Sequence, residues 1–502
     1  MKKIILVVLI MILFQTSYGL AMPPHPDKKP KDGYSTQGIS EPRRQSLSFS
    51  PQGAVTGSAN ILVIPIQFTD KQFQSNHSTD YFQQLITGPL KSMKSFYEEN
   101  SYGKFTISAH VSPVVTSDYT MAYYGGNENG EVDPIVQELA REAVQKLDDQ
   151  GFDFSPYDED GDGELDHLYI IHAGYGEEEL DGTEDDIWSH QWSIHNDYSV
   201  GEEVDGIWAI DYCMVPETGT VGVFVHEFGH DLGLPDLYDY DHSSAGIGDW
   251  DVMGGGSWNA LPGEPSGSSP AHFSIWSKLQ LGWISPMEQV INEGNIQLLN
   301  IEDNDTGIKL KITDTEYFLI ENRQKAGFDE ALPGHGALIW HVDEFRWKYH
   351  ESLDTGDYND NEYHPLLALE QADGYNQLQN GMNYGDGGDP YPGIQLNTSF
   401  DDASYPSSKS YAGTDTNISV TDILETNGII TMNIQVEDAP VDLEIYDLNG
   451  DGDLDLEDLT YLSAIYNTRR NIDSQYEEKS DLNTDGIIDL YDLVILSKKF
   501  NF

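Results

Sequence analysis

Two histidines spaced four residues apart in an apolar stretch, His226 and His230, place the strongest constraint on how this chain can fold. On an α-helix this spacing puts both imidazole rings on one face, one turn apart, where they can bind the same metal ion. Glu227 lies beside the first histidine, where its carboxylate can take a proton from a water molecule at the metal. Gly233 predicts the end of the helix in a sharp turn. The stretch therefore predicts a zinc site with Glu227 as general base.

The turn after this helix supplies the candidate third zinc ligand. Pro235 prevents the helix from resuming, and Asp236 follows it directly. The resulting pattern, H-E-x-x-H-x-x-G-x-x-D, resembles that of metzincin-type metallopeptidases, with aspartate in place of the commoner third histidine. Asp239 or a distant glutamate are the alternatives for this ligand.

Residues 250–254 (WDVMG) resemble a Met-turn, in which Met253 would form an apolar floor under the metal and not a ligand. The alternative is a chance match of H-E-x-x-H on an ordinary amphipathic helix, and the glycine turn, the aspartate and the methionine argue against it. A tetrahedral oxyanion also needs a stabilising group besides the metal. Gly255 occupies the place two residues after the methionine, where a tyrosine could serve. Tyr238 and His190 are therefore the candidates, and the sequence does not rank them.

Acidic residues far outnumber basic ones in this chain. It has 86 Asp and Glu against 26 Lys and Arg, a net charge of −60. This balance argues against nucleic acid and anionic membrane surfaces as partners, because both bind through cationic side chains. Solubility is one interpretation of so many acids. Calcium binding is the sharper one, because some of the acids recur at the spacing of calcium ligands.

Two acidic loops near the C-terminus have the ligand spacing of an EF-hand-like calcium site. Ligand oxygens fall at loop positions 1, 3, 5, 9 and 12, with a backbone carbonyl at position 7 and a glycine at the tight turn. The loops run into short apolar helices expected at 459–466 and 493–500, and a solvated acidic tail would not explain this register. The predicted ligands are Asp447, Asn449, Asp451, Asp453, Asp455 and Asp458 in the first loop, and Asp481, Asn483, Asp485, Ile487, Asp489 and Asp492 in the second.

The two loop–helix repeats in residues 441–502 resemble a dockerin type I domain. This resemblance implies a cohesin domain on a scaffold protein as partner. In dockerins the partner is selected by the residue pair at loop positions 10 and 11. Here those pairs are Leu456 with Glu457 and Leu490 with Tyr491.

A third acidic loop lies well before the zinc motif and has acids at positions 1, 3, 5 and 9, but Tyr169 at position 12. We interpret it as a structural calcium site, with a bare acidic turn as the alternative. Its candidate ligands are Asp158, Asp160, Asp162, Glu164 and Asp166.

The N-terminus has the pattern of a secretory signal peptide, residues 1–21, with two lysines before an apolar run that is too short to span a bilayer. Cleavage is expected after Gly19 or Ala21, and no later stretch predicts a membrane anchor. Residues 22–55 predict a flexible leader or short pro-segment, and a cysteine switch is excluded there because they contain no cysteine. The only cysteine of the chain, Cys213, is predicted to be a packed free thiol.

The patterns along the chain predict an α+β protein. The apolar run 61–68 and the run 168–172 predict buried strands, and Asp133 with Pro134 predicts the start of an amphipathic helix that ends at Gly151. After about residue 290 the pattern becomes β-rich, with strands expected at 296–299, 317–321, 337–342 and 429–436. We expect a metzincin-like zinc peptidase domain at 56–290, a β-rich part at 291–436, a linker at 437–440 and a small all-α calcium-binding module at 441–502.

Eight stretches of the sequence match one known family. They are SMKSFYEENSYGKF (92–105), DEDGDGELDHLYIIHAGYG (158–176), DIWSHQW (186–192), VHEFGHDLGLPDLYD (225–239), DWDVMGGGSW (249–258), AHFSIWSKLQLGW (271–283), YFLIENRQKAGFDEALPGHGALIWHVD (317–343) and EQADG (370–374). Through them the region from about residue 60 to residue 436 resembles the immune inhibitor A family of secreted metallopeptidases. The resemblance implies endopeptidase activity on proteins, one catalytic zinc ion and bound calcium. Members are often made as zymogens, and this chain differs in its very short leader.

Together these features predict a secreted zinc endopeptidase that a dockerin attaches to a cohesin-bearing scaffold, as in a cellulosome, outside the cell or at its surface. One alternative is an inactive binding or structural subunit of the same complex. His226, Glu227 and His230 are all intact, which favours the enzyme. A zinc hydrolase acting on a glycan is a second alternative, and only the family resemblance argues against it.

Overall fold

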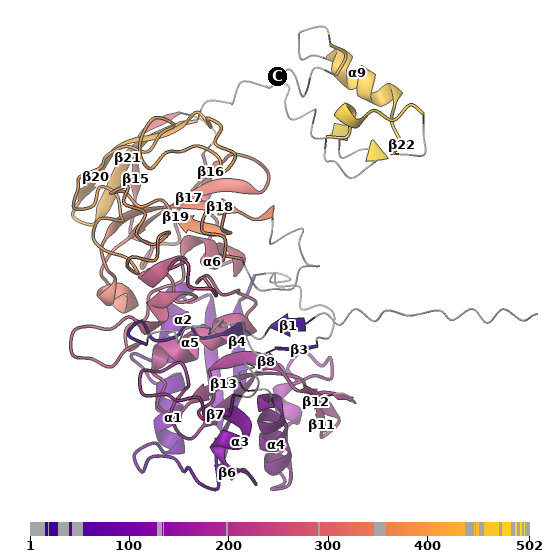
Figure 1. Cartoon of the computed structure of the whole chain (residues 1–502), viewed down its shortest axis with the longest axis vertical. Coiled ribbons are helices and arrows are strands. Elements are labelled where there is room, and N and C mark those ends of the chain that lie inside the picture. Colours follow the sequence, from indigo (N-terminus) through magenta and orange to yellow (C-terminus); the bar gives the residue numbers. More distant parts are fainter. Residues whose placement is uncertain are drawn as a thin grey trace, which may run out of the picture.

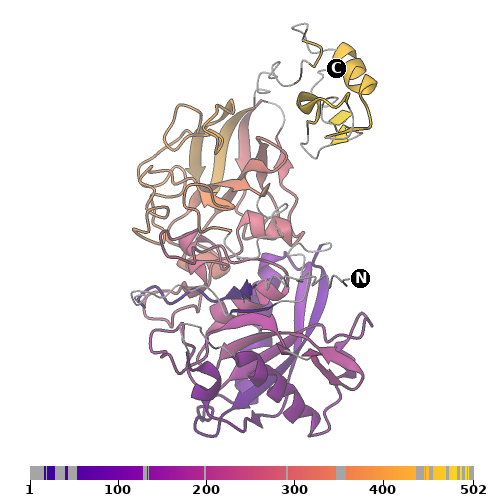
Figure 2. The same ribbon diagram turned by 45° about the vertical axis from the view of Figure 1, so that its right-hand side comes forward.

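The computed structural model describes residues 16–18, 20–28, 40–42, 54–127, 133, 135–196, 199–289, 292–345 and 358–436, and a broken set of residues between 446 and 496. Figures 1 and 2 show a lower unit built around one large sheet, an upper unit of two smaller sheets, and a small C-terminal unit set apart from both. Within the described residues, no helix has the length and apolar character needed to cross a membrane.

The lower unit is organised around a seven-stranded sheet. Six of its strands follow the order β2-β8-β13-β7-β4-β5, and the seventh strand, β6, pairs with β4. The strands β5, β4, β7 and β13 are parallel, whereas β8 is antiparallel to β13 and β2 is antiparallel to β8. The bounds are β2 Leu20–Ala21, β4 Gly57–Gln67, β5 Phe105–Val111, β6 Val115–Thr116, β7 Leu168–His172, β8 His190–Ser193 and β13 Asp211–Pro216. The runs predicted as buried strands fall in β4 and β7, whose apolar side chains are covered on both faces, as in other parallel sheets.

Alternate residues of these strands enter two different cores, because side chains of a strand point to opposite faces. One face, with Val63 and Ile171, packs in the same apolar cluster as helices α1 (Thr79–Thr87), α2 (Met93–Asn100) and α5 (Val221–Asp231). The other face, with Leu62 and Ile170, packs with α3 (Met121–Gly125) and α4 (Val136–Asp148). The predicted zinc helix, α5, is therefore buried against the sheet.

The predicted start of α4 is wrong. Asp133 does not cap the helix, which begins at Val136 with Ile135 in the cap position. The Asp133 carboxylate instead accepts a hydrogen bond from the backbone N–H of Trp188 at 2.8 Å, and its backbone adopts a φ of 45°. The Asp133 carboxylate thus bonds to a distant loop and not to the helix that the local pattern predicted it would cap.

The upper unit packs two antiparallel-rich sheets face to face around a separate apolar core. The five-stranded sheet contains β14 Met287–Glu288, β16 Ile308–Lys311, β17 Glu316–Arg323, β18 Gly336–Asp343 and β19 Leu367–Leu369. The three-stranded sheet contains β15 Glu293–Leu298, β20 Ile418–Thr426 and β21 Ile429–Val436. All four stretches expected as strands in this half correspond to strands here, at β15, β17, β18 and β21.

One apolar cluster extends across both units. Strand β17 directs Phe318 into the upper core and Leu319 into the cluster that contains helix α5. That cluster also includes Trp340 of β18 and Trp276 of helix α6 (Ile275–Gln280). The fully buried Arg323 lies at the same junction, donating two hydrogen bonds to the Asp329 carboxylate at 2.6 and 2.9 Å. The peptidase region and the β-rich region are thus joined by continuous packing.

The C-terminal unit contains α9 (Leu456–Ala464), so the helix expected at 459–466 begins three residues earlier. The described residues also include paired strands, β22 Thr468–Arg469 and β23 Ile487–Ile488, so they do not bear out the expected all-α module. This strand pairing places Arg469, which follows helix α9, opposite Ile487 at position 7 of the second calcium loop. The helix expected at 493–500 lies largely outside the described residues. The small apolar core is formed by Leu448, Leu462, Ile488 and Leu496.

Short two-stranded ribbons complete the fold. They are β1 Thr16–Tyr18 with β3 Ser40–Pro42, β9 His195–Asn196 with β10 Ser199–Val200, and β11 Glu202–Val204 with β12 Ile207–Ala209.

Candidate metal centre

Helix α5 carries the histidines and lies directly on Met253. Every residue from Val221 to His230 is buried, which agrees with an apolar helix enclosed by protein. A Cβ atom at Gly229 would lie only 2.6 Å from the Met253 sulfur, so the glycine allows this side chain to pack against the helix. Met253 therefore packs against helix α5 beside Gly229, and its role as a Met-turn residue stays a prediction.

Three potential ligand atoms converge at the end of this helix. The Nε2 atoms of His226 and His230 lie 3.1 Å apart. Oδ1 of Asp236 lies 3.2 Å from the first Nε2 atom and 3.3 Å from the second. All three side chains are fully buried. The structure thus brings together the residues that the sequence proposed as zinc ligands.

Backbone carbonyls orient both imidazole rings. Nδ1 of His226 lies 2.8 Å from the Val252 carbonyl oxygen, and Nδ1 of His230 lies 2.8 Å from the Leu234 carbonyl oxygen. Because a carbonyl only accepts, each Nδ1 carries the proton and each Nε2 presents a lone pair. The two lone pairs face each other and a carboxylate oxygen with no proton between them. This arrangement needs a cation.

Asp236 is held by its second oxygen. Oδ2 accepts a hydrogen bond from the Tyr240 hydroxyl at 2.7 Å, which leaves Oδ1 to face the histidines. Burial raises the pKa of Asp236, but His230 and His226, when they are protonated, outweigh this effect and lower the pKa below its ordinary value. The alternative ligand Asp239 is committed elsewhere, because its oxygens accept hydrogen bonds from the backbone N–H groups of Asp241 and Ser244.

Glu227 lies buried beside the three ligand atoms. Neither of its carboxylate oxygens forms a hydrogen bond among the described residues. Burial raises its pKa well above the ordinary value, the Asp236 charge adds to the rise, and the nearby Met22 backbone opposes it. A buried carboxylate without a protein partner is positioned to serve a ligand or a water molecule.

The structure separates the two candidates for oxyanion stabilisation. The Tyr238 hydroxyl donates a hydrogen bond of 2.6 Å to the carbonyl oxygen of Ala21, which lies at the metal centre. His190 is fully buried, with one ring nitrogen 2.7 Å from the Trp188 carbonyl oxygen and the other 3.0 Å from the Tyr212 hydroxyl. Burial lowers the pKa of His190 to about 4. Of the two, only Tyr238 reaches a carbonyl at this site.

Residues 20–28 enter the site, which the sequence reasoning missed. Residues 20 and 21 were expected to lie in the signal peptide and residues 22–28 in a flexible leader. Instead residues 20 and 21 form strand β2, Ala21 and Met22 are buried, and the Ala21 N–H lies 3.3 Å from Asp236 Oδ2. Partners separated by 215 positions in the sequence leave no local signal. The extended backbone favoured by the two prolines after Met22 was the only hint.

The predicted acidic loop brings three of its carboxylates together. Asp158, Asp160 and Asp162 each present a carboxylate oxygen to one common point. Asp166 accepts a hydrogen bond from the Glu159 backbone N–H at 2.6 Å, and it lines a cavity of about 210 Å³ that also includes Asp162, Glu164 and His230. The acidic loop therefore borders the metal centre.

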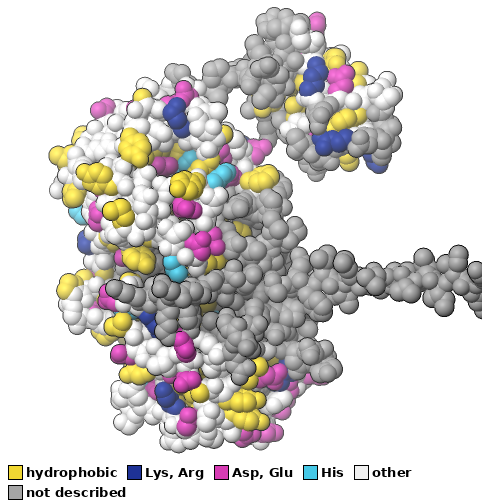
Figure 3. All heavy atoms as spheres, in the orientation of Figure 1, with side chains coloured by type: hydrophobic (Ala, Val, Ile, Leu, Met, Phe, Trp, Pro, Cys, Tyr) yellow, Lys and Arg dark blue, Asp and Glu magenta, His cyan; other side chains and the backbone are white. Residues whose placement is uncertain are grey.

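A third cluster, Asp373, Asp386 and Asp389, was not predicted from the sequence. Its members come from two turns of the upper unit, and the DGGD stretch at 386–389 could have drawn attention to it. Acidic side chains are widespread on the visible face of the molecule (Figure 3), so such a cluster alone does not define a site.

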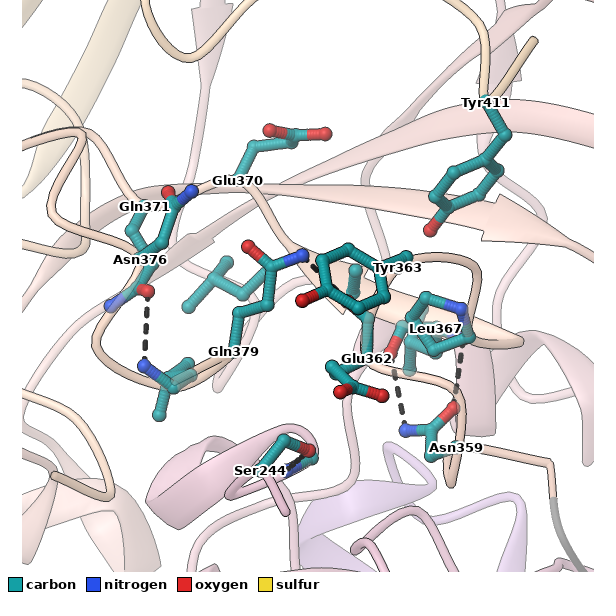
Figure 4. A pocket seen from close by; sticks show the side chains of 15 residues that line it. Ser244, Asn359, Glu362, Tyr363, Leu367, Glu370, Gln371, Asn376, Gln379 and Tyr411 are labelled. Atoms are coloured by element: carbon teal, nitrogen blue, oxygen red, sulfur yellow. Dashed lines mark hydrogen bonds between the residues drawn. The ribbon is translucent and has the colours of Figure 1, made fainter. Parts of the chain in front are cut away.

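A second cavity, of about 130 Å³, lies in the upper unit next to the loop that carries the aspartate ligand (Figure 4). Asn359 lines it and donates hydrogen bonds to the carbonyl oxygens of Leu367, at 3.2 Å, and Leu237, at 2.7 Å. Leu237 directly follows Asp236 in the sequence. The β-rich region therefore helps to hold the loop of the third ligand.

Comparison with protein families identifies the class of each part of the chain. Residues 53–284 match the immune inhibitor A peptidase M6 catalytic domain, and residues 445–501 match the dockerin type I domain. The chain thus contains a peptidase M6 catalytic domain followed by a dockerin type I domain, which confirms the resemblances found in the sequence.

Individual relatives agree with this assignment. Immune inhibitor A of Bacillus thuringiensis subsp. alesti is 37% identical over 220 residues, covering 38% of this chain and 31% of the relative. The pre-pro-metalloprotease PrtV of Vibrio cholerae serotype O1 is 31% identical over 315 residues, covering 50% of this chain and 34% of the relative. The chain spans about a third of the length of the curated relatives it matches.

Proposed function

We propose that this chain is a secreted zinc endopeptidase that hydrolyses protein substrates and is attached through its dockerin to a cohesin-bearing scaffold, as in a cellulosome. The observation that carries the enzymatic part is the triangle formed by His226, His230 and Asp236, with the unpartnered carboxylate of Glu227 beside it. The matches to the M6 catalytic domain and to two metalloprotease-type relatives support the same conclusion.

The donor set fits zinc. Zinc binds histidine nitrogen and aspartate oxygen at about 2.0–2.2 Å in tetrahedral geometry, which places neighbouring ligand atoms about 3.3–3.5 Å apart. The observed separations of 3.1, 3.2 and 3.3 Å are close to these values. Three protein ligands leave a fourth position for water or substrate, as in catalytic zinc sites.

Zinc bound there would supply Lewis-acid activation of water and of the peptide carbonyl. In this proposal Glu227 accepts the proton of the attacking water and passes it to the leaving amine. A cation at the three ligands favours the ionised carboxylate against the burial that raises its pKa. In this proposal the Tyr238 hydroxyl donates a hydrogen bond to the carbonyl oxygen of the peptide bond that is cut, as it does to the Ala21 carbonyl oxygen.

Calcium is proposed in three loops. The first is the acidic loop that contains Asp158, Asp160 and Asp162, with Glu164 and Asp166 nearby. The other two are in the dockerin, where the carboxylate at position 12 accepts from a backbone N–H near the start of its loop, at position 3 in the first loop and at position 2 in the second. Asp458 accepts from the Asn449 backbone N–H at 3.1 Å, and Asp492 accepts from the Leu482 backbone N–H at 2.7 Å.

Of the other predicted dockerin ligands, Asn449, Asp481 and Ile487 are described. The remaining predicted ligands, together with Leu490 and Tyr491 of the cohesin contact, lie outside the described residues. They are Asp447, Asp451, Asp453, Asp455, Asn483, Asp485 and Asp489.

Metal removal tests the proposed activity. The purified full chain should hydrolyse an unfolded protein such as casein, lose this activity in a chelator, and regain it when zinc is restored with calcium present. Calcium alone should not restore hydrolysis, because the buried site has two nitrogen ligands, which calcium disfavours. Metal content is measured in each sample. Full activity in a protein shown to be free of zinc would contradict the proposal, as would no hydrolysis by the zinc-loaded protein.

Cohesin binding tests the proposed attachment. Leu456 is 59% exposed at the first turn of α9, where it can contact a partner. In the full chain with calcium, Leu456→Asp should weaken binding to a recognised cohesin at least about tenfold, because a charge would be buried in the contact. Leu424→Asp is the matched control, since Leu424 is 54% exposed on β20 of another unit. Titration of a cohesin panel measures the effect. Absence of any calcium-dependent binding would contradict the attachment.

A further inference from the structure

We propose that in the secreted chain, with the signal peptide cut after Gly19, residues 20–25 lie in the peptide-binding groove as a substrate would, and that the enclosure of the Met22 side chain selects an apolar residue immediately after the cleaved bond. The same geometry makes Tyr238 the hydrogen-bond donor to the carbonyl of that bond. This inference rests on the proposed endopeptidase function and specifies its substrate class. The substrates are proteins with an accessible extended segment carrying a Met-sized apolar side chain at this position.

The backbone of the segment adds a strand to the edge of the large sheet. Leu20 pairs with Gln191 and Ala21 pairs with His190, in antiparallel register with β8. The pairing continues where the Met22 N–H donates to the Ser189 carbonyl oxygen at 3.2 Å. Strand addition at a sheet edge recognises the backbone of an extended peptide whatever its side chains. Strand β8 can therefore hold a substrate segment as it holds the chain's own residues.

The bond between Ala21 and Met22 lies at the metal centre. The Ala21 N–H is 3.3 Å from Oδ2 of the ligand Asp236, and the Ala21 carbonyl oxygen accepts from the Tyr238 hydroxyl at 2.6 Å. A donor directed at this carbonyl would also stabilise the charge that develops on its oxygen during attack. These two contacts fix which peptide bond occupies the reacting position.

The side chain that follows this bond is enclosed. Met22 is 0% exposed and belongs to the apolar cluster that includes helix α5. Two tryptophans hold the backbone directly after this side chain. Trp188 Nε1 donates to the Met22 carbonyl oxygen at 2.8 Å, and Trp258 Nε1 donates to the Pro23 carbonyl oxygen at 2.9 Å. A charged side chain placed here would lose its hydration without gaining a partner, so the site should discriminate strongly against Asp and Glu.

The segment is anchored further along by contacts that do not involve the Met22 enclosure. The Lys28 ammonium donates to the carbonyl oxygens of Glu179 and Gly182, at 3.0 and 3.1 Å, and to that of Glu177. The His25 N–H donates to the Glu178 carbonyl oxygen at 2.9 Å. Removing the Lys28 ammonium should therefore release the segment while the groove itself stays intact.

A peptide probe tests whether the segment occupies the groove. A fluorescent peptide with the sequence of residues 17–27 (SYGLAMPPHPD) is titrated against full-length, zinc-loaded Glu227→Gln chains, in which it should not be cut. Adding Lys28→Ala should tighten binding at least about tenfold, because the competing segment is loosened. Lys409→Ala is the control, since the Lys409 ammonium pairs with Asp415 in the upper unit and makes no contact with the described residues of the segment. Equal affinity for these two proteins would overturn the assignment of the segment to the groove.

Variation of the probe tests the enclosure. Replacing its methionine by leucine should keep the affinity within a few-fold, whereas aspartate should weaken it at least about 100-fold. Cleavage sites mapped in casein should then show apolar residues after the cut bond and few acidic ones. An aspartate peptide that binds as well as the methionine peptide would overturn the specificity assignment, as would cleavage without regard to this residue.

Tyr238→Phe separates donation at the carbonyl from binding. In the active chain it should lower kcat at least about tenfold, a larger factor than the loss of peptide affinity measured in the Glu227→Gln background, because the hydrogen bond strengthens as charge develops on the carbonyl oxygen. Tyr123→Phe, at a tyrosine 49% exposed on α3, is the control. An unchanged kcat would overturn the role of Tyr238. If the peptides bind as stated but no zinc-loaded chain cuts protein, the endopeptidase proposal fails. If zinc-dependent cleavage occurs without these preferences, only this inference fails.

Discussion

A Glu227→Gln chain is expected to keep its zinc and its fold but to lose protein hydrolysis by at least about 100-fold in kcat, because a positioned general base contributes about 10²–10⁴-fold. The ligands His226, His230 and Asp236 are untouched by this change. Glutamine has nearly the same volume as glutamate but cannot accept the proton. The buried carboxylate has no hydrogen bond to lose among the described residues, so little destabilisation is expected.

Hydrolysis rates, zinc content and a melting curve measured on the same samples check this result. Glu203→Gln is a suitable control, because Glu203 is an exposed carboxylate on β11 and lies outside the ligand set. Hydrolysis at the wild-type rate by a zinc-loaded Glu227→Gln protein would contradict the assignment of the base. Loss of zinc along with activity would instead make Glu227 important for metal binding.

An Arg323→Met chain is expected to lose about 3–5 kcal/mol of stability, since removing one partner of a buried ion pair leaves uncompensated charge. The guanidinium donates to both Asp329 oxygens and to the Trp250 carbonyl oxygen at 3.1 Å. It also lies 3.6 Å from Glu321 Oε1 and 3.7 Å from Glu302 Oε1. Methionine fills much of the same volume but satisfies none of these groups.

Urea unfolding followed by tryptophan fluorescence measures the loss, with Lys325→Met as control because Lys325 is exposed two residues away. Arg323→Lys should fall between the two, since lysine keeps the charge but not the paired donors. Equal unfolding midpoints for Arg323→Met and Lys325→Met would show that the ion cluster does not stabilise the junction.

Local chemistry explains what could be predicted from the sequence. The histidine spacing, the glycine turn and Asp236 lie within one helix and its turn, so the pattern was enough to bring three ligand atoms together. The acidic loop at 158–166 is equally local. Alternating and continuous apolar runs likewise located β4, β7 and the strands of the β-rich region.

Long-range contacts explain what could not be predicted. Asp133 follows the rules for a helix cap, but a backbone N–H more than fifty positions away took its carboxylate. The placement of residues 20–28 depends on β8 and on two tryptophans at positions 188 and 258, and no pattern near Met22 encodes these partners. The choice between Tyr238 and His190 as the proposed oxyanion-stabilising residue also depends on a long-range contact, because it requires knowing that the segment with Ala21 passes the metal centre.

The apolar cluster shared by the two large units bears on how such a chain can be rearranged by recombination. The match to the catalytic domain ends at residue 284, yet Leu319 and Trp340 belong to the same buried cluster as helix α5. A gene exchange at that boundary would expose buried apolar side chains on both halves. We therefore expect recombination to keep the residues up to the end of β21 together with the catalytic domain. The C-terminal unit has its own small cluster. Evolution can therefore gain, lose or exchange that unit without repacking the two large units.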